Sequence, residues 1–170
     1  MYIRLFGAFM IIVGSGGIGA VMLLQYLQAS RALRQLSVAL ETMICEVQYK
    51  LSPLSVMCRA AARSTEGTVR KLLFAFAEEL DKQIAPDAYQ CMCSAIRKTE
   101  KLSGAILPHL RKLGKSMGQF DLEGEIRMLE SALSDCRKSI EQLEENKQYR
   151  IRSYQTLSIC AGVALAVLLF

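Results

Sequence analysis

The fold of this chain is decided by residues 5–27, which read LFGAFMIIVGSGGIGAVMLLQYL and contain no charged side chain. As an α-helix rising about 1.5 Å per residue, this stretch is long enough to cross a hydrocarbon layer of about 30 Å. A second uncharged stretch, SYQTLSICAGVALAVLLF, occupies residues 153–170. Every charged residue except Arg4 lies between the two stretches. The sequence therefore predicts two transmembrane helices, 5–27 and 154–170, on either side of one polar domain, 30–152.

A cleaved signal peptide is the main alternative for the first stretch. Arg4 precedes the apolar run, and Gly19 or Ala20 could be the small residue at a cleavage site. The apolar residues continue well past that position to Leu27, which favours a membrane span. A buried helix of a soluble protein is a poorer explanation, because two such helices would need a much larger domain to cover them.

The basic residues next to the two apolar stretches indicate the orientation in the membrane. All but Arg4 lie on the inner side, namely Arg31, Arg34, Lys147, Arg150 and Arg152. Lys and Arg are enriched in cytoplasmic segments, so we expect a cytoplasmic middle domain and both termini outside. Without Arg4, the 21 basic residues of the chain leave 20 in this domain, interleaved with all 16 acidic ones. Such a mixed surface does not indicate nucleic-acid binding.

Within the middle domain, apolar residues recur at helical spacing and no segment alternates as a strand would. The predicted fold class is all-α, a cytoplasmic helical bundle flanked by an N-terminal and a C-terminal transmembrane helix. The first span should continue into a helix ending at Ser52-Pro53, with Ser52 as cap and Pro53 in the next first turn. Further helices are expected at 53–62, 69–84, 87–102 and 107–117. Gly118 should stop the last of these, and Asp121 should cap a final helix that runs on into the second span.

The first span carries small residues at a spacing of four, in two pairs: Ser15 with Gly19, and Gly16 with Ala20. This pattern lets two transmembrane helices approach closely. We therefore predict that these four residues pack against another membrane helix, although glycines in a lipid-facing helix would also explain them.

No motif predicts catalysis, a cofactor or a metal. Gly114-Lys115-Ser116 copies the end of a phosphate-binding loop, but His109 stands where the first glycine is needed and a helix is expected before it. Cys91 and Cys93 would point in different directions on a helix and have no second cysteine pair at ligand spacing. The six cysteines, with Cys160 inside a predicted span, are interpreted as small buried hydrophobic residues. A small membrane enzyme or metal-binding protein thus requires one of these weak motifs to be real.

Several strings in order resemble one family over essentially the whole chain. They are RALRQL at 31–36, EVQY at 46–49, SPL at 52–54 and LGKSMGQFD at 113–121. The chain is similar to the stage III sporulation protein AB family of endospore-forming bacteria, in which the last string takes the form Leu-Gly-x-x-Leu-Gly-x-x-Asp. Two departures are Ala88-Tyr89, in a region where a tryptophan is common, and Glu125, where glutamine is usual.

The resemblance implies a non-enzymatic scaffold of the channel complex that joins mother cell and developing spore, similar to the platform protein of type II secretion and type IV pilus systems. It implies a location in the mother-cell membrane that surrounds the forespore. The implied partners are a cytoplasmic ATPase like stage III sporulation protein AA and other members of the complex, and self-association stays open. A platform protein of a pilus or secretion system outside sporulation is the alternative within this class.

Glu46 is the candidate for direct contact with the partner, because it could reach a basic group from the first helix of the domain. Four further residues belong to the motifs of the resemblance: Pro53, Gly114, Gly118 and Asp121. For these four, a role as helix stops and caps explains the residue type without any partner.

Overall fold

The structure, a computed structural model, describes residues 2–50, 52–82, 87–119 and 121–169. Side chains are described for residues 24–50, 52–82, 87–119 and 121–145. All elements within these residues are helices, so the all-α prediction is confirmed for the described part of the chain.

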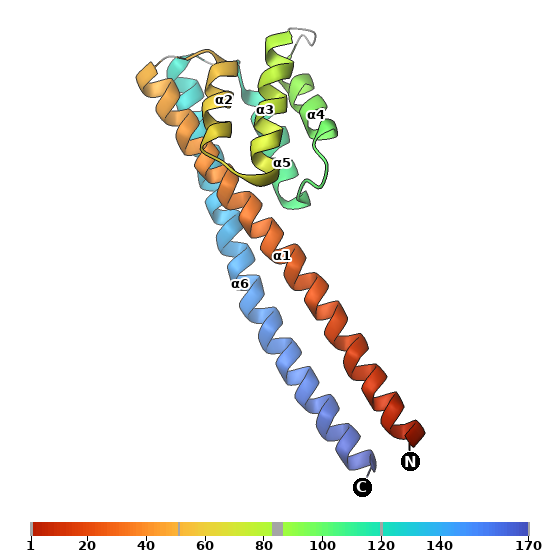
Figure 1. Ribbon diagram of the computed structural model, residues 1–170. Coiled ribbons are helices and arrows are strands. Elements are labelled where there is room, and N and C mark those ends of the chain that lie inside the picture. Colours follow the sequence, from red (N-terminus) through yellow and green to blue (C-terminus); the bar gives the residue numbers. More distant parts are fainter. Residues whose placement is uncertain (1, 51, 83–86, 120, 170) are drawn as a thin grey trace.

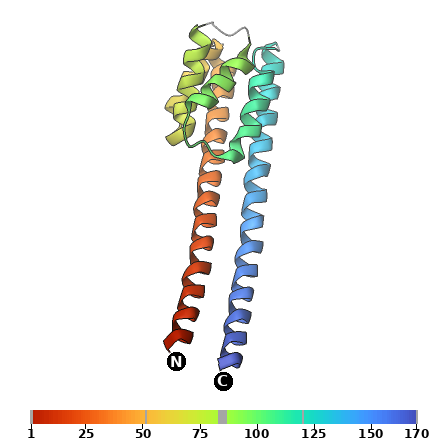
Figure 2. The ribbon, with the colours of Figure 1, turned by 90° about the vertical axis from the view of Figure 1, so that its right-hand side faces the viewer.

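Two long helices dominate the molecule. The first, α1 (Tyr2–Lys50), and the last, α6 (Leu122–Leu169), run antiparallel and side by side, and both chain termini lie together at one end (Figures 1 and 2). As predicted, each helix continues without a break from the middle domain into an apolar stretch. Two ion pairs link the helices, Arg34 to Glu144 at 2.7 Å and Arg137 to Glu41 at 2.8 Å.

Four shorter α-helices form a bundle beside the half of α1 that is remote from the termini (Figure 1). They are α2 (Leu54–Arg63), α3 (Gly67–Lys82), α4 (Ala88–Lys98) and α5 (Leu107–Ser116), with the 3-10 helix η1 (Gly104–Ile106) before α5. Helices α2 and α3 contact α1, α4 packs on α3, and α5 packs on α4 and α6. Their inner faces and one face of α1 bury a continuous apolar core, whose largest members include Leu33, Leu36, Leu40, Met43, Leu72, Leu73, Phe76, Met92 and Leu110. Nearly all of these positions follow from the helical spacing of the sequence.

Two predicted helix ends are wrong. Ser52 does not cap α2, because its hydroxyl donates to Glu46 Oε2 at 3.2 Å and Pro53 stands at the cap position instead. The fourth helix ends at Lys98 rather than at residue 102. Beyond it, Lys101 adopts a positive φ of 59°, and the chain turns into η1.

The two predicted spans fall mostly on residues whose side chains are not described. Where the structure describes side chains, no helix combines the length and the apolar character needed to cross a membrane. Only residues 24–27 of the stretch 5–27 belong to that part, and none of 154–170 does. The four small residues predicted to pack in the first span also lie outside it: Ser15, Gly16, Gly19 and Ala20.

Candidate partner-binding site

The end of the bundle opposite the chain termini brings two turns together. We call it the distal end; it comprises residues 46–57, where α1 passes into α2, and residues 117–125, where α5 passes into α6. A cavity of about 140 Å³ lies between the two turns. Its wall is apolar except for Ser52 and Glu125, and is completed by Val47, Leu54, Met57, Gly118 and Leu122.

Large apolar side chains are exposed around this end. Tyr49 is 82% exposed in the last turn of α1, Val56 is 48% exposed in the first turn of α2, and Leu122 is 46% exposed at the start of α6. Single exposed apolar residues are ordinary on protein surfaces. Here three of them lie on helix ends that meet at one end of the bundle, beside a cavity that Leu122 also lines. This combination is typical of a surface that binds a partner.

Glu46 lies at the distal end, but its carboxylate is already engaged. Oε1 accepts a hydrogen bond from Lys50 Nζ at 2.6 Å and Oε2 accepts one from Ser52 Oγ at 3.2 Å. The hydrogen bond from Lys50 is the largest cause that lowers the pKa of Glu46. Its side chain is only 12% exposed, so Glu46 fixes the α1–α2 turn. The spacing of four between Glu46 and Lys50 is the sequence signal for this contact.

The α5–α6 turn has the geometry that its residue types indicate. Gly118 has φ +77°, a left-handed conformation that glycine adopts without steric cost. Asp121 Oδ1 accepts a hydrogen bond from the Gly124 N–H at 3.2 Å, which is an N-cap contact. Together with Pro53 and Glu46, these residues place four of the five candidates on the distal end.

Gly114, the fifth candidate, lies away from the distal turns where α5 crosses α4. A β-carbon added at this position would stand 2.8 Å from Met92 Cβ and 3.5 Å from Tyr89 Cα. The two helices can therefore approach this closely only because residue 114 has no side chain. Gly114 supports the bundle rather than forming part of the cavity.

The motifs considered for chemistry do not assemble a site in the described part of the chain. Gly114-Lys115-Ser116 occupies the last turn of α5, whereas phosphate binds at helix N-termini. Among the residues with described side chains, no group of three His, Cys, Asp or Glu is placed to hold a metal ion. His109 Nε2 lies 3.1 Å from Ser139 Oγ and links α5 to α6.

The cysteines are not all buried, contrary to the prediction. Cys58, Cys91 and Cys136 are buried, Cys93 is intermediate and Cys45 is exposed. Burial raises the pKa of Cys136 to about 11, and the charge of Asp135 adds to this effect. A thiol with so high a pKa is a poor nucleophile and a poor metal ligand at neutral pH.

The fold and the site define an all-helical protein whose bundle stands on two long antiparallel helices and has a cavity at its distal end. Comparison with known sequences gives the family. The chain belongs to the family described as stage III sporulation protein AB, whose profile matches residues 4–170. The resemblance noted in the sequence is thereby confirmed.

Two known proteins are similar to this chain. The stage III sporulation protein AB of Bacillus subtilis (strain 168) is 26% identical over 169 residues, covering 98% of this chain and 99% of the relative. A solved structure of a stage III sporulation protein AB has a TM-score of 0.62 and 24% identity, and the alignment covers 72% of this chain and 98% of that chain. The second comparison supports the helical fold alone.

Proposed function

We propose that this protein is a non-enzymatic, membrane-anchored platform of the channel complex between mother cell and forespore, and that its distal end docks a cytoplasmic ATPase. Membership of the stage III sporulation protein AB family supports a role in sporulation. The partner proposed from the family resemblance is a secretion-type ATPase like stage III sporulation protein AA. The single observation that carries the docking proposal is the cavity at the distal end, which has the exposed Leu122 in its wall and the exposed Tyr49 and Val56 on the adjoining helix ends.

The register of the two long helices supports membrane anchoring. Both ion pairs between α1 and α6 join residues whose numbers add to 178. Continued along the two helices, this register sets the start of the stretch 154–170 level with Leu24, close to the end of 5–27. Two membrane spans that leave the same side of a bilayer need their apolar stretches at the same level. The bundle then stands on the cytoplasmic side, with both termini outside.

The charges of the distal end favour a basic partner. Its acidic residues are Glu46, Asp121, Glu123 and Glu125. Its one basic residue, Lys50, pairs with Glu46, and the neighbouring Arg127 pairs with Glu123. Glu125 lies in the cavity wall and belongs to no ion pair among the described residues. We expect the ATPase to insert an apolar side chain next to Leu122 and to place a basic group near Glu125.

Within the membrane, we propose that the small residues Ser15, Gly16, Gly19 and Ala20 contact other members of the complex, or further copies of this chain. The membrane would be that of the mother cell around the forespore. Membership of this family also favours a sporulation complex over a pilus or secretion system outside sporulation.

The docking proposal is tested by capturing the ATPase of the same organism on the full-length chain in detergent. Leu122→Lys places a cation at the cavity and should abolish capture. Val38→Lys is the matched control, because Val38 is a partly exposed apolar residue of α1 away from the distal end, 39% exposed against 46% for Leu122. Capture by the unchanged chain and by Val38→Lys, with loss in Leu122→Lys, supports the proposal.

Failure of the unchanged chain to retain the ATPase would contradict the docking proposal. Glu46→Lys is a poorer probe, since it also breaks the contacts to Lys50 and Ser52 that hold the α1–α2 turn.

A further inference from the structure

The edge of the bundle nearest the chain termini is a second surface. It is formed by the α2–α3 turn, residues 63–67, and by the α4–η1 turn, residues 97–104, and we call it the proximal edge. Both turns lie on the side of the bundle that faces the chain termini (Figures 1 and 2). If those helices cross a membrane, as proposed above, the proximal edge faces the bilayer. The inference below rests on that part of the proposed function.

The position of the proximal edge along α1 is given by side-chain contacts and packing. The Glu66 N–H donates to Gln35 Oε1 at 2.9 Å, so the α2–α3 turn is tied to α1. The η1 helix also packs against α1. Arg31 lies four residues, about 6 Å of helix, beyond the end of the stretch 5–27. The phosphate-bearing headgroup layer is several ångströms thick, so long basic side chains at this level can reach it.

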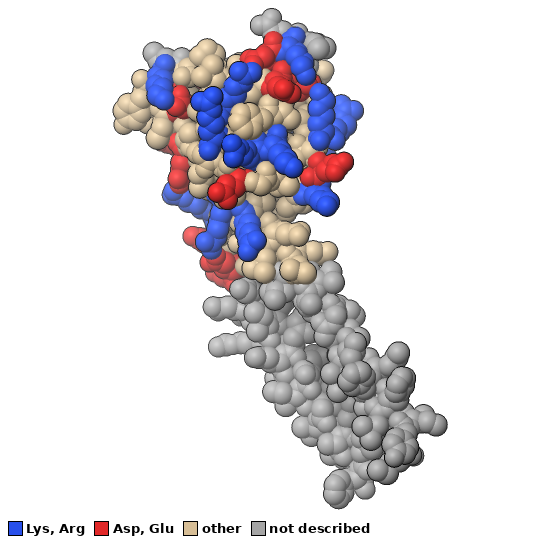
Figure 3. All heavy atoms as spheres, viewed as in Figure 1, with Lys and Arg blue, Asp and Glu red and all other residues tan. Residues whose placement is uncertain are grey.

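Basic groups outnumber acidic ones at the proximal edge. Its two turns carry four exposed cations and two exposed carboxylates, Arg63, Arg97, Lys98 and Lys101 against Glu66 and Glu100. Arg31 of α1 is a further exposed cation, about one helical turn nearer the termini than Gln35, while the exposed Glu144 of α6 is paired with Arg34. Figure 3 shows Lys and Arg side chains near the border of the bundle with the grey region, with Asp or Glu side chains among them at one side.

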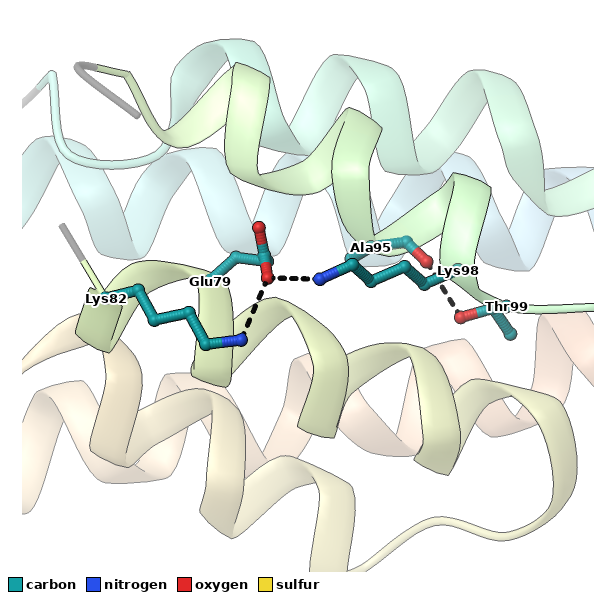
Figure 4. A network of polar contacts seen from close by, with 5 residues as sticks. All are labelled: Glu79, Lys82, Ala95, Lys98 and Thr99. Carbon is teal, nitrogen blue, oxygen red and sulfur yellow. Dashed lines mark hydrogen bonds and ion pairs between the residues drawn. The ribbon is translucent and has the colours of Figure 1, made fainter. Parts of the chain in front are cut away.

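Not all of these cations are equally available. Lys98 Nζ is bound to Glu79 Oε1 at 2.7 Å, and Lys82 contacts the same oxygen at 3.4 Å (Figure 4). Arg63 and Arg97 lie in the last turns of α2 and α4, where basic residues also stabilise the helix dipole. Their presence is explained without any ligand.

Lys101 is different, because neither a helix dipole nor an ion pair among the residues with described side chains accounts for it. It is exposed, it lies outside any helix, and it is the one residue other than glycine with positive φ among those described. A left-handed conformation is unfavourable for a residue with a β-carbon, and glycine at that position would avoid this cost. Thr99 Oγ1 donates to Ala95 O at 2.8 Å and closes the end of α4 just before this turn (Figure 4). A lysine kept at a strained position points to a use for its charge.

We propose that the proximal edge binds the anionic phosphate headgroups of the lipid bilayer, with Lys101 at the centre of the contact and Arg31, Arg63 and Arg97 around it. Basic residues close to the cytoplasmic leaflet are attracted by its negative surface potential. The contact sets the tilt of the bundle on the membrane, and it turns the distal end towards the cytoplasm.

The test uses the full-length chain in lipid nanodiscs of phosphatidylcholine alone or mixed with phosphatidylglycerol. Amide hydrogen exchange of residues 64–67 and 99–104 is measured by mass spectrometry. We expect slower exchange in the anionic discs and loss of the difference at high salt. Lys101→Glu should reduce the added protection about fivefold or more, the factor that one cation near an anionic surface contributes. Lys115→Glu is the matched control, because Lys115 is an exposed lysine in the last turn of α5, near the distal end.

A second variant separates lipid contact from folding. Lys101→Gly removes the charge and relieves the backbone, so it should melt at a higher temperature than the unchanged chain and still lose the added protection. If the protein floats with the discs and its amide exchange is equal in the two lipid compositions, the proposed lipid contact is contradicted and the membrane anchoring is not. Protein that does not float with the discs contradicts the anchoring itself. Equal loss in the variants of Lys101 and Lys115 also overturns the proposal, because the attraction would then not be specific to this edge.

Discussion

The short helices and the described part of α6 are packed in different ways. Among the short helices α2, α3 and η1 contact α1, α4 packs on α3, and α5 packs on α4 and α6. Phe76, Leu72 and Met92 of the bundle are completely buried. Along residues 122–145 of α6 only Leu129 and Cys136 are buried, and the rest of its apolar seam stays partly exposed, namely Ile126, Leu133, Ile140 and Leu143. The bundle thus has a closed core, whereas α6 lies along its border.

The contacts at the edges of α6 are polar and mostly exposed. Ion pairs join it to α1 through Arg34 and Glu41, and to α5 through Lys112, whose Nζ lies 2.6 Å from Asp135 Oδ2. Exposed ion pairs contribute about 0–1 kcal/mol each. We infer that α6 can move against the bundle at lower cost than α2 to α5 can move among themselves. This would suit the role proposed above, in which α6 connects a membrane span to the distal end.

The largest expected effect comes from comparing one core deletion in each region. Phe76→Ala should lower the free energy of unfolding by about 3–5 kcal/mol, because it leaves a cavity in a closed core. Leu133→Ala should cost less than about 2 kcal/mol, because water already reaches that side chain and fills the space. Chemical denaturation of both variants in detergent measures the difference. Equal losses would contradict the contrast between the two regions.

Gly114→Ala examines how tightly the bundle itself is packed. Alanine normally stabilises a helix relative to glycine by about 1 kcal/mol. At this position the new β-carbon would meet Met92 Cβ at 2.8 Å, so we expect a net loss of about 1–3 kcal/mol from overpacking.

Gly104→Ala is the control for that substitution, since an added β-carbon there has no neighbour within 4 Å. Its melting temperature should be unchanged or slightly higher. A stabilised Gly114→Ala would show that α4 and α5 can separate freely.

Asp121→Ala probes the start of α6, where the peripheral helix joins the distal end. Loss of the hydrogen bond from the Gly124 N–H should cost about 1 kcal/mol. Asp121→Asn keeps an acceptor oxygen and should retain most of that stability. If the melting temperatures of both variants equal that of the unchanged chain, Asp121 does not cap the helix.

The sequence predicts the local features of this fold well, but it predicts poorly which of them come into contact. The turn at Gly118 and Asp121 follows from residue types that act within a few positions of each other. The end of α4 was missed because Leu102 continues the helical spacing although the backbone has already turned at Lys101.

The cavity shows the same limit for the candidate site. Its wall joins Leu54 of α2 to Leu122 of α6, which are far apart in the chain, and no spacing along the sequence indicates that they meet. Glu46 was predicted as a partner contact from its residue type alone. Its engagement by Ser52 depends on the path of the α1–α2 turn, which only the structure gives.

The smallest expected effect concerns pH and the polar contact between α5 and α6. Burial lowers the pKa of His109 below its ordinary value of 6.5, so the folded state favours the neutral ring more than the unfolded chain does. As pH falls through about 6.5, the unfolded chain takes up a proton more readily than the folded one, and stability should decrease. The pKa values of Glu46, Glu79 and Asp135 are also lowered, but these carboxylates affect stability only in a more acidic range.

His109→Gln should flatten the dependence of stability on pH between about pH 7 and about pH 5.5, whereas Ser139→Ala removes the partner hydroxyl and keeps the titrating ring. Denaturation across that range measures how stability depends on pH. If His109→Gln shows the same dependence as the unchanged chain, His109 is not the source of the pH sensitivity, and the contacts between α5 and α6 do not titrate near neutrality.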